Sequence, residues 1–248
     1  MRKFGLIGYP LGHSFSGKYF MEKFQRTSIT DCVYSNYAIE SIGLLAGILE
    51  DAELEGLNVT IPYKESVIPF LHQKDPVVEE TGACNCIRIK DGFLTGYNTD
   101  VKGFEKSLTE KLTATDNRAL ILGTGGSSKA VSWVLRQRGI GFLFVSRKLS
   151  GEADQISYND LDREIIESHS LIINSTPLGM YPKTGECPPI PYEWVGAKHY
   201  LFDLVYNPAK TLFLEKGESA GARIKNGADM LAIQAEASWD IWNGVSAR

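Results

Sequence analysis

A glycine-rich turn carries the clearest chemical signal in the chain. The segment LILGTGGSSKA, residues 120–130, runs from a predicted apolar strand into a predicted helix. Gly123 allows a tight turn, Gly125 allows the backbone to approach a pyrophosphate, and the helix N-terminus offers unpaired N–H groups and a partial positive charge. Ser128 stands where a third glycine is usual, and it is small enough for close packing. The pattern predicts a dinucleotide-binding turn, which also includes Thr124, Gly126 and Ser127.

The strand that follows indicates which dinucleotide. It reads GFLFVSRK and ends in Ser146, Arg147 and Lys148, with no carboxylate. A free ribose 2′-hydroxyl is usually held by an acid at this point, whereas two cations suit a 2′-phosphate. The alternative is that Arg147 and Lys148 only solvate a loop. We expect the cofactor to be NADP(H).

A second group of polar side chains stands at the end of another apolar strand, in LNVTIPYKE, residues 57–65. Asn58 and Thr60 share one face of an alternating strand, so both need hydrogen-bond partners if that face is buried. Hydroxyl groups of a ligand would supply them. Lys64 follows just after Pro62 ends the strand; the alternative interpretation is a solubilising surface lysine.

Predicted strands and helices alternate steadily along the chain, and this alternation predicts an α/β fold. These elements would position the residues above. The expected strands are 3–9, 32–39, 57–61, 86–90, 93–97, 118–123, 142–145, 171–174, 201–205 and 222–225. The expected helices include 17–25, 41–51, 65–72, 101–112, 127–138 and 228–242. Asp91-Gly92 is a strong hairpin signal, and the polar stretch 113–117 resembles a linker. Two α/β units with a boundary near Thr99 to Asp116 are the natural division.

Composition excludes several classes of protein. The 248 residues carry a formal net charge of −4, which does not favour a nucleic-acid partner. The N-terminal apolar run is too short for a signal peptide, and no run is long enough for a membrane span. The four cysteines form no C-x-x-C pair and the four histidines have no metal-ligand spacing, so we expect reduced thiols, a cytoplasmic protein and no metal site.

At this point the chain resembles the shikimate dehydrogenase family over nearly its whole length. The resemblance rests on eight motifs in order: GYPLGHSFS from Gly8, GLNVTIPYKE from Gly56, GACN from Gly82, GYNTDVKGF from Gly96, LGTGGSSKA from Leu122, NSTPLGM from Asn174, FDLVYNP from Phe202 and NGADMLAIQA from Asn226. The family implies reversible reduction of 3-dehydroshikimate to shikimate with NADPH, on the chorismate route to aromatic amino acids.

The resemblance also implies residue roles. Ser14 and Ser16 would hold the substrate carboxylate, and Lys64 and Asp100 would be the catalytic pair. The remaining substrate-binding residues would be Asn58, Thr60, Asn85, Gln234 and Tyr206. The remaining cofactor-binding residues would be Thr176, Met180, Leu204 and Gly227. The family pattern further implies a substrate domain, residues 1–99, with a mostly parallel sheet, joined by a returning C-terminal helix, 227–248, and a Rossmann-like NADP-binding domain, 100–226.

The chemistry implied for the catalytic pair is proton transfer. Hydride arriving at a ketone carbon leaves negative charge on oxygen, and a protonated lysine can stabilise that charge and deliver a proton. Asp100 has a second interpretation as the N-cap of the helix that begins near Val101. One carboxylate can serve both purposes because it has several lone pairs.

Two departures from the family pattern stand out. Gly17 follows Ser16 where proline is usual, and the segment after Lys148 looks shortened where the family often has a helix and a further basic residue. Two other functions stay open: a quinate/shikimate dehydrogenase that uses NAD(P), and a non-catalytic NADP or quinate sensor. We expect a small-molecule substrate, no nucleic-acid or membrane partner, and a monomer or homodimer.

Overall fold

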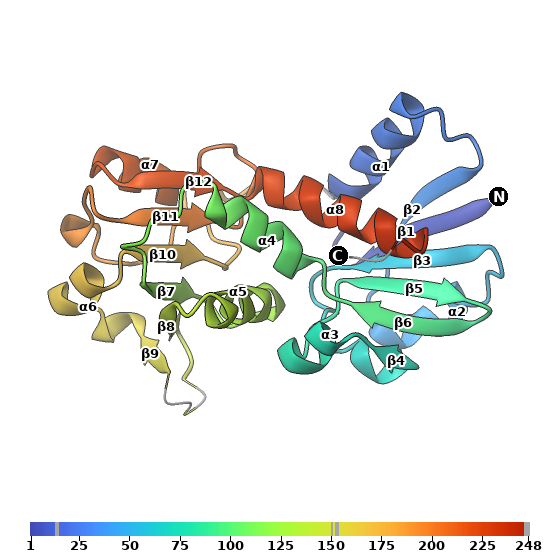
Figure 1. Ribbon diagram of the computed structural model, residues 1–248, viewed down its shortest axis with the longest axis horizontal. Coiled ribbons are helices and arrows are strands. Elements are labelled where there is room, and N and C mark those ends of the chain that lie inside the picture. The colour runs from blue at the N-terminus through green and yellow to red at the C-terminus, as the bar shows by residue number, and fades with distance from the viewer. Residues whose placement is uncertain (13–14, 150, 152–153, 246–248) are drawn as a thin grey trace. The chain divides into compact units, whose positions relative to one another are not determined.

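The computed structural model describes residues 1–12, 15–149, 151 and 154–245 (Figure 1). The chain divides into two compact units. Unit 1 comprises Met1–Thr99 and Gln234–Arg248, and unit 2 comprises Asp100–Ile233. The predicted carboxylate ligand Ser14 lies outside the described residues. Each unit is described by itself below.

Unit 1 is built on a six-stranded sheet in the order β2-β1-β3-β5-β6-β4. Its strands are β1 (Arg2–Gly8), β2 (Cys32–Ala38), β3 (Leu54–Val59), β4 (Gln73–Lys74), β5 (Cys86–Lys90) and β6 (Phe93–Tyr97). The pairs β1–β2, β1–β3 and β4–β6 are parallel, and β5 is antiparallel to both of its neighbours. The sheet is therefore mostly parallel, as expected. Its helices are α1 (Phe15–Arg26), the short α2 (Leu45–Ile48) and α3 (Pro76–Thr81).

The hairpin prediction is confirmed, because Asp91 and Gly92 have φ of 52° and 75° between β5 and β6. The predicted helix over residues 65–72 is wrong. Only a 3₁₀ turn, η2 (Ile68–Phe70), forms there, and it ends at the extended residue Leu71. The following backbone bonds to β6 instead, since His72 N–H donates to the Leu94 carbonyl at 2.9 Å. The predicted helix over 41–51 is likewise reduced to a 3₁₀ turn, η1 (Ile42–Leu44), and α2.

An aromatic core anchors the C-terminal half of α8 (Ala228–Trp242) on the sheet of unit 1. Trp242 stacks on Phe4 with ring centroids 4.8 Å apart, and its Nε1 donates to the Ile87 carbonyl at 3.0 Å. A Cβ at Gly56 would overlap the Trp242 ring, so glycine is required for this packing. The expected return of the C-terminal helix to the first unit is confirmed by these contacts.

Unit 2 contains an all-parallel sheet in the order β12-β11-β10-β7-β8-β9. Its strands are β7 (Arg118–Leu122), β8 (Gly141–Ser146), β9 (Gln155–Ser157), β10 (Leu171–Asn174), β11 (Tyr200–Asp203) and β12 (Arg223–Asn226). Counted within the unit, this order is 3-2-1-4-5-6, the Rossmann arrangement. The predicted Rossmann-like fold is confirmed, and the strand order reverses between β7 and β10.

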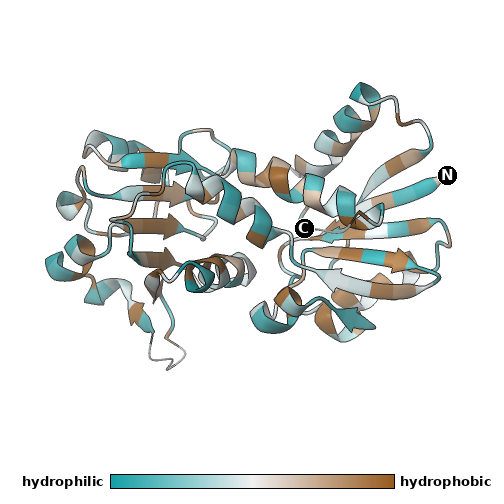
Figure 2. Cartoon of the chain, in the orientation of Figure 1, coloured by the Kyte–Doolittle hydropathy of each residue, from teal (hydrophilic) through white to brown (hydrophobic). Residues whose placement is uncertain are grey.

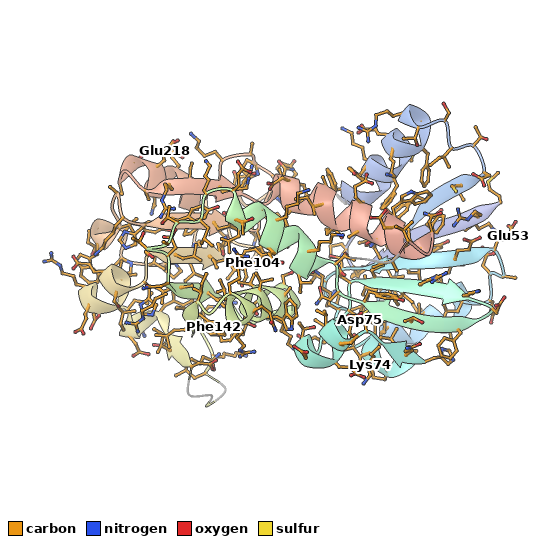
Figure 3. The ribbon with its side chains drawn as sticks, in the orientation of Figure 1. Glu53, Lys74, Asp75, Phe104, Phe142 and Glu218 are labelled. Carbon is orange, nitrogen blue, oxygen red and sulfur yellow. The ribbon has the colours of Figure 1, made fainter. Side chains whose placement is uncertain are left out.

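Helices α4 (Asp100–Thr109), α5 (Gly126–Gln137), α6 (Arg163–Ser168) and α7 (Leu212–Ser219) complete unit 2, with the 3₁₀ turns η3 (Tyr158–Asp160) and η4 (Tyr192–Trp194). Hydrophobic residues mark the strands of its sheet in Figure 2, in keeping with a parallel sheet that is buried on both faces. Phe104 of α4, labelled in Figure 3, packs edge-on against Phe202 of β11. The two ring centroids are 5.2 Å apart.

Candidate functional site

The glycine turn lies at the reversal point of the unit 2 sheet. Gly123 has φ of 103°, a left-handed conformation that favours glycine, and a Cβ there would lie 2.9 Å from Thr176 Cγ2. Gly125 is the N-cap of α5, and its added Cβ would meet no atom within 4 Å. The buried Ser128 donates its hydroxyl to the Gly125 carbonyl at 2.6 Å. The turn therefore presents open backbone at a helix N-terminus, where nucleotide phosphates bind in this fold.

The strand ends beside this turn carry the other predicted cofactor residues of unit 2. Gly227, just after β12, approaches Leu204, just after β11, so closely that a Cβ at Gly227 would overlap the Leu204 carbonyl. Tyr206, which was predicted to bind the substrate, follows in the same loop and is half-buried. Met180 lies after β10, with 41% of its surface exposed. The exposed apolar surface of Met180, together with the open backbone at Gly125, suits a dinucleotide.

The two cationic residues predicted to bind a 2′-phosphate, Arg147 and Lys148, follow the end of β8. Ser146 is buried and its Oγ accepts a hydrogen bond from Lys148 N–H at 3.3 Å, while the side chains of Arg147 and Lys148 are exposed. Tyr158 lies near Arg147, whose charge opposes the burial that raises the pKa of this tyrosine to about 12. With two exposed cations and no acid at the strand end, the residues fit a 2′-phosphate.

In unit 1, the predicted substrate residue Asn58 is held at both ends. Its Nδ2 donates to Ser238 Oγ at 2.9 Å, and its Oδ1 accepts from the Tyr34 hydroxyl at 2.9 Å. Burial raises the pKa of Tyr34 well above its ordinary value, against the opposing effect of a hydrogen bond with Ser16. Ser16 and Asn58 therefore both hydrogen-bond with the Tyr34 side chain, and their roles as substrate ligands stay a prediction.

Asn85 and Gln234 belong to the same buried network through Thr99. Asn85 Nδ2 donates to Thr99 Oγ1 at 3.0 Å, and Asn85 Oδ1 accepts from Thr99 N–H at 2.7 Å. Gln234 Oε1 accepts from Asn85 Nδ2 and from Thr99 Oγ1, both at 3.4 Å. Ser238 Oγ lies 3.2 Å from Thr99 Oγ1, which joins this group to Asn58. The structure therefore gathers three of the predicted substrate side chains.

Thr60 and Lys64 lie beside this network. Both are half-buried, in the loop after β3. Thr60 N–H donates to the Ile7 carbonyl at 2.9 Å, and Cys84 N–H donates to the Lys64 carbonyl at 2.7 Å. The second bond fixes the lysine backbone next to the Cys84-Asn85 segment. Asp100 is buried, begins α4 and follows Thr99 directly, but it is assigned to unit 2. The pairing of Lys64 with Asp100 stays a prediction.

Sequence reasoning missed four polar side chains that hold the candidate residues in place. They are Tyr34, Thr99, Ser238 and Asp203. Thr99 and Asp203 stand inside the family motifs GYNTDVKGF and FDLVYNP, which were the available signal. Tyr34 and Ser238 stand in no quoted motif.

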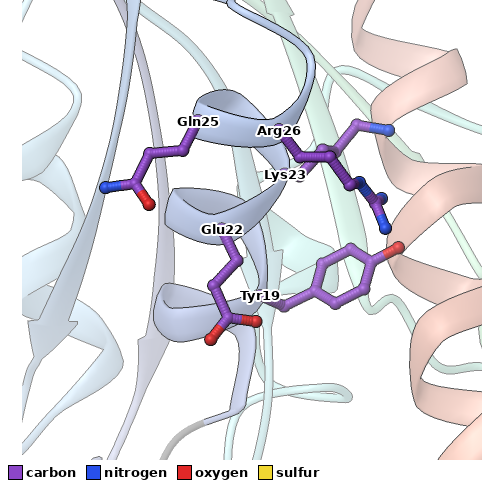
Figure 4. A pocket seen from close by; sticks show the side chains of 5 residues that line it. All are labelled: Tyr19, Glu22, Lys23, Gln25 and Arg26. Atoms are coloured by element: carbon purple, nitrogen blue, oxygen red, sulfur yellow. The ribbon is translucent and has the colours of Figure 1, made fainter.

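An open hollow of about 520 Å³ lies on α1, and none of the predicted site residues lines it. It is lined by Tyr19, Glu22, Lys23, Gln25 and Arg26 (Figure 4). Within residues 1–12, 15–149, 151 and 154–245, there is no cluster of three acidic, histidine or cysteine side chains that could hold a metal. That same part of the chain contains no helix with the length and apolarity needed to cross a membrane.

A family model matches a segment of unit 1. Residues 6–87 match the model of the shikimate dehydrogenase substrate binding domain. The NADP(+) shikimate dehydrogenase of Methanosphaera stadtmanae is 33% identical over 258 residues, covering 97% of this chain and 90% of that protein.

Solved structures agree with this relationship. Shikimate dehydrogenase 1 from Peptoclostridium difficile is 35% identical, with a TM-score of 0.88 over 100% of this chain and 94% of that one. Shikimate 5-dehydrogenase from Thermus thermophilus, solved with NADP(H) and shikimate, is 27% identical, with a TM-score of 0.86 over 98% of this chain and 94% of that one.

Proposed function

The chain belongs to the shikimate dehydrogenase family, and from this we propose that it catalyses the reversible NADPH-dependent reduction of 3-dehydroshikimate to shikimate. The observation that carries the proposal is similarity along almost the full chain to NADP(+) shikimate dehydrogenases. The route it would serve is the synthesis of chorismate and the aromatic amino acids.

We propose that unit 2 is the NADP-binding domain. The turn from Gly123 to Ser127 would hold the pyrophosphate, because its open backbone and the N-terminus of α5 attract phosphate. The end of β8 would hold the 2′-phosphate, with Arg147 able to contact it through two nitrogens. The residues that would complete the cofactor site are Thr176, Met180, Leu204 and Gly227. NADPH, when bound, supplies the hydride.

We propose that unit 1 is the substrate-binding domain. Ser14 and Ser16 would bind the substrate carboxylate, and Thr60 and the network of Asn58, Asn85 and Gln234 would bind the ring hydroxyls or ketone. The donors of these amides are already oriented by neighbouring side chains, which lowers the entropy lost on binding. Tyr206 would also contact the substrate.

Lys64 and Asp100 would act on the reacting oxygen. The Lys64 ammonium would stabilise the negative charge that forms there and deliver the proton, and Asp100 would hold the ammonium in place. In the oxidative direction the same lysine, uncharged, would accept the proton from the substrate hydroxyl.

A spectrophotometric assay of the purified protein with shikimate and NADP tests the proposal. We expect an increase in absorbance at the wavelength of the reduced cofactor. Faster oxidation of quinate, or a preference for NAD, would support the quinate/shikimate alternative. Binding of NADP with no oxidation of either substrate would support the sensor.

We also propose a cytoplasmic protein, either monomer or homodimer. Four free thiols, at Cys32, Cys84, Cys86 and Cys187, are consistent with a reducing compartment.

A further inference from the structure

A buried carboxylate to which the sequence analysis gave no role lies at the end of β11 in unit 2, within the motif FDLVYNP. Asp203 is the last residue of β11 and is fully buried. Its Oδ1 accepts hydrogen bonds from Asn174 Nδ2 at 2.9 Å and from Val205 N–H at 3.0 Å. Its Oδ2 accepts from the Thr211 hydroxyl at 2.5 Å. Burying a carboxylate costs free energy even when three donors surround it. A role in fixing those partners would explain why it is there.

The bond to Asn174 determines which way that amide points. With its nitrogen on Asp203, Asn174 turns its Oδ1 toward Thr176, where it accepts from the backbone N–H at 3.0 Å and from the hydroxyl at 2.6 Å. Thr176 Cγ2 in turn lies against Gly123, as the 2.9 Å approach to an added Cβ shows. The ends of three neighbouring strands, β11, β10 and β7 (Figure 1), are thus connected through side chains.

We propose that Asp203 is a positioning residue for the cofactor: through Asn174 it holds Thr176 against the Gly123 turn and so keeps the NADP site in its binding shape. The inference rests on the proposed function, because it assumes that the Gly123 turn binds NADP. Asp203 itself is not a catalytic residue, since it is buried behind Asn174 and acts through it.

The carboxylate has two arms, and only one leads to the turn. The Asn174 arm continues to Thr176 and Gly123. The Thr211 arm leads to α7, where Thr211 is the N-cap and its Oγ1 accepts from Leu214 N–H at 3.4 Å. A purely structural Asp203 would need both arms about equally, whereas the positioning role depends on the Asn174 arm.

The experiment measures the Kd for NADP by titration calorimetry in five proteins: the parent, Asp203→Ala, Asp203→Asn, Asn174→Ala and Thr211→Val. We expect Asp203→Ala and Asn174→Ala each to weaken NADP binding about tenfold or more, since loss of one charge-assisted bond is worth about that factor. Asp203→Asn should stay within about threefold of the parent, because its Oδ1 can still accept from Asn174 while its amide donates to Thr211 Oγ1. Thr211→Val should lose stability but keep the parent Kd.

Kinetics add a second readout. The KM for NADP should rise in Asp203→Ala and Asn174→Ala, while the KM for shikimate changes by less than about twofold, because unit 1 is untouched. An unchanged Kd in Asn174→Ala, or an equal loss in Thr211→Val, would overturn the positioning role. Asn174→Ala keeps the test decisive if Asp203→Ala does not fold. A parent that binds NADP but does not oxidise shikimate would overturn the proposed function alone. The NADP Kd values of the variants would still test whether Asp203 acts through Asn174 and Thr176.

Discussion

The Nδ2 of Asn58 donates to the Oγ of Ser238 at 2.9 Å, although 180 residues separate the two in the chain. Asn58 stands on β3 and Ser238 on α8, and Tyr34 on β2 fixes the other end of the same amide. An amide that is held at both ends cannot flip, so it keeps a single arrangement of its donor and acceptor. Such a support is what a precise binding site needs behind its contact residues.

Replacing Ser238 with alanine should therefore weaken both stability and substrate binding. The change removes the nearer acceptor of Asn58 Nδ2, leaves it only the longer bond to the Asn85 carbonyl at 3.4 Å, and removes the contact with Thr99 Oγ1. We expect this to cost about 1–3 kcal/mol in the free energy of unfolding. Urea denaturation measures that loss, and steady-state kinetics should show a raised KM for shikimate at an unchanged KM for NADP.

Ser132→Ala is the matched control for this variant. Ser132 is another buried helical serine, in α5 of unit 2, and its hydroxyl donates to the Lys129 carbonyl of its own helix at 3.1 Å. We expect it to leave the KM for shikimate at the parent value. Equal changes in the two variants would argue against a specific role for Ser238.

Removal of the proposed catalytic groups should affect turnover more than folding. Lys64→Ala and Asp100→Ala should each reduce kcat by about 10²–10⁴-fold, the usual range for loss of a general acid or base. The exposed Lys18, whose partner Glu22 lies one turn along α1, provides the control, and Lys18→Ala should keep the parent kcat. Near-parent turnover in both active-site variants, with circular dichroism showing intact folds, would refute the proton-transfer assignment.

Arg147 should determine the preference for NADP over NAD. Arg147→Ala removes an exposed guanidinium at the end of β8, and we expect the KM for NADP to rise about 10–100-fold while the KM for NAD changes little. The comparison needs kinetics with both cofactors at fixed ionic strength, because salt screens exposed charges. Arg163→Ala, on α6 and also exposed, should leave both values unchanged. A parent without any preference for NADP would contradict the cofactor assignment.

The buried carboxyl of Asp203 should make stability depend on pH. Burial raises its pKa from an ordinary value of 3.8 to about 7, despite the opposing hydrogen bonds from Thr211, Val205 and Asn174. Between these two values the folded state binds more protons than the unfolded state, so this group's contribution to stability falls as pH rises.

Asp203→Asn cannot titrate, so the difference between the two proteins isolates the effect. The parent should become less stable relative to Asp203→Asn on going from pH 5 to pH 8, measured as the free energy of unfolding in urea at each pH. A constant difference across that range would mean that Asp203 ionises at an ordinary pKa in the folded protein.

Local patterns in the sequence determined much of the fold. The apolar run after Arg118 predicted a buried parallel strand, and the Asp91-Gly92 pair predicted the hairpin, because the backbone geometry of each depends on neighbouring residues. Local signals failed at residues 65–72. There, hydrogen bonds to β6 replace helical ones, and the sequence alone does not show that a sheet edge is available.

The sequence by itself determined the family and the two kinds of α/β unit, and it predicted residues for binding and proton transfer, because motifs and periodicity are properties of the chain order. Only the tertiary structure decided which side chains support them: Ser238 and Tyr34 behind Asn58, Thr99 between Asn85 and Gln234, and Asp203 behind Asn174. The physical reason is that a buried polar group takes its hydrogen-bond partner from whatever the fold places about 3 Å away, at any separation along the chain.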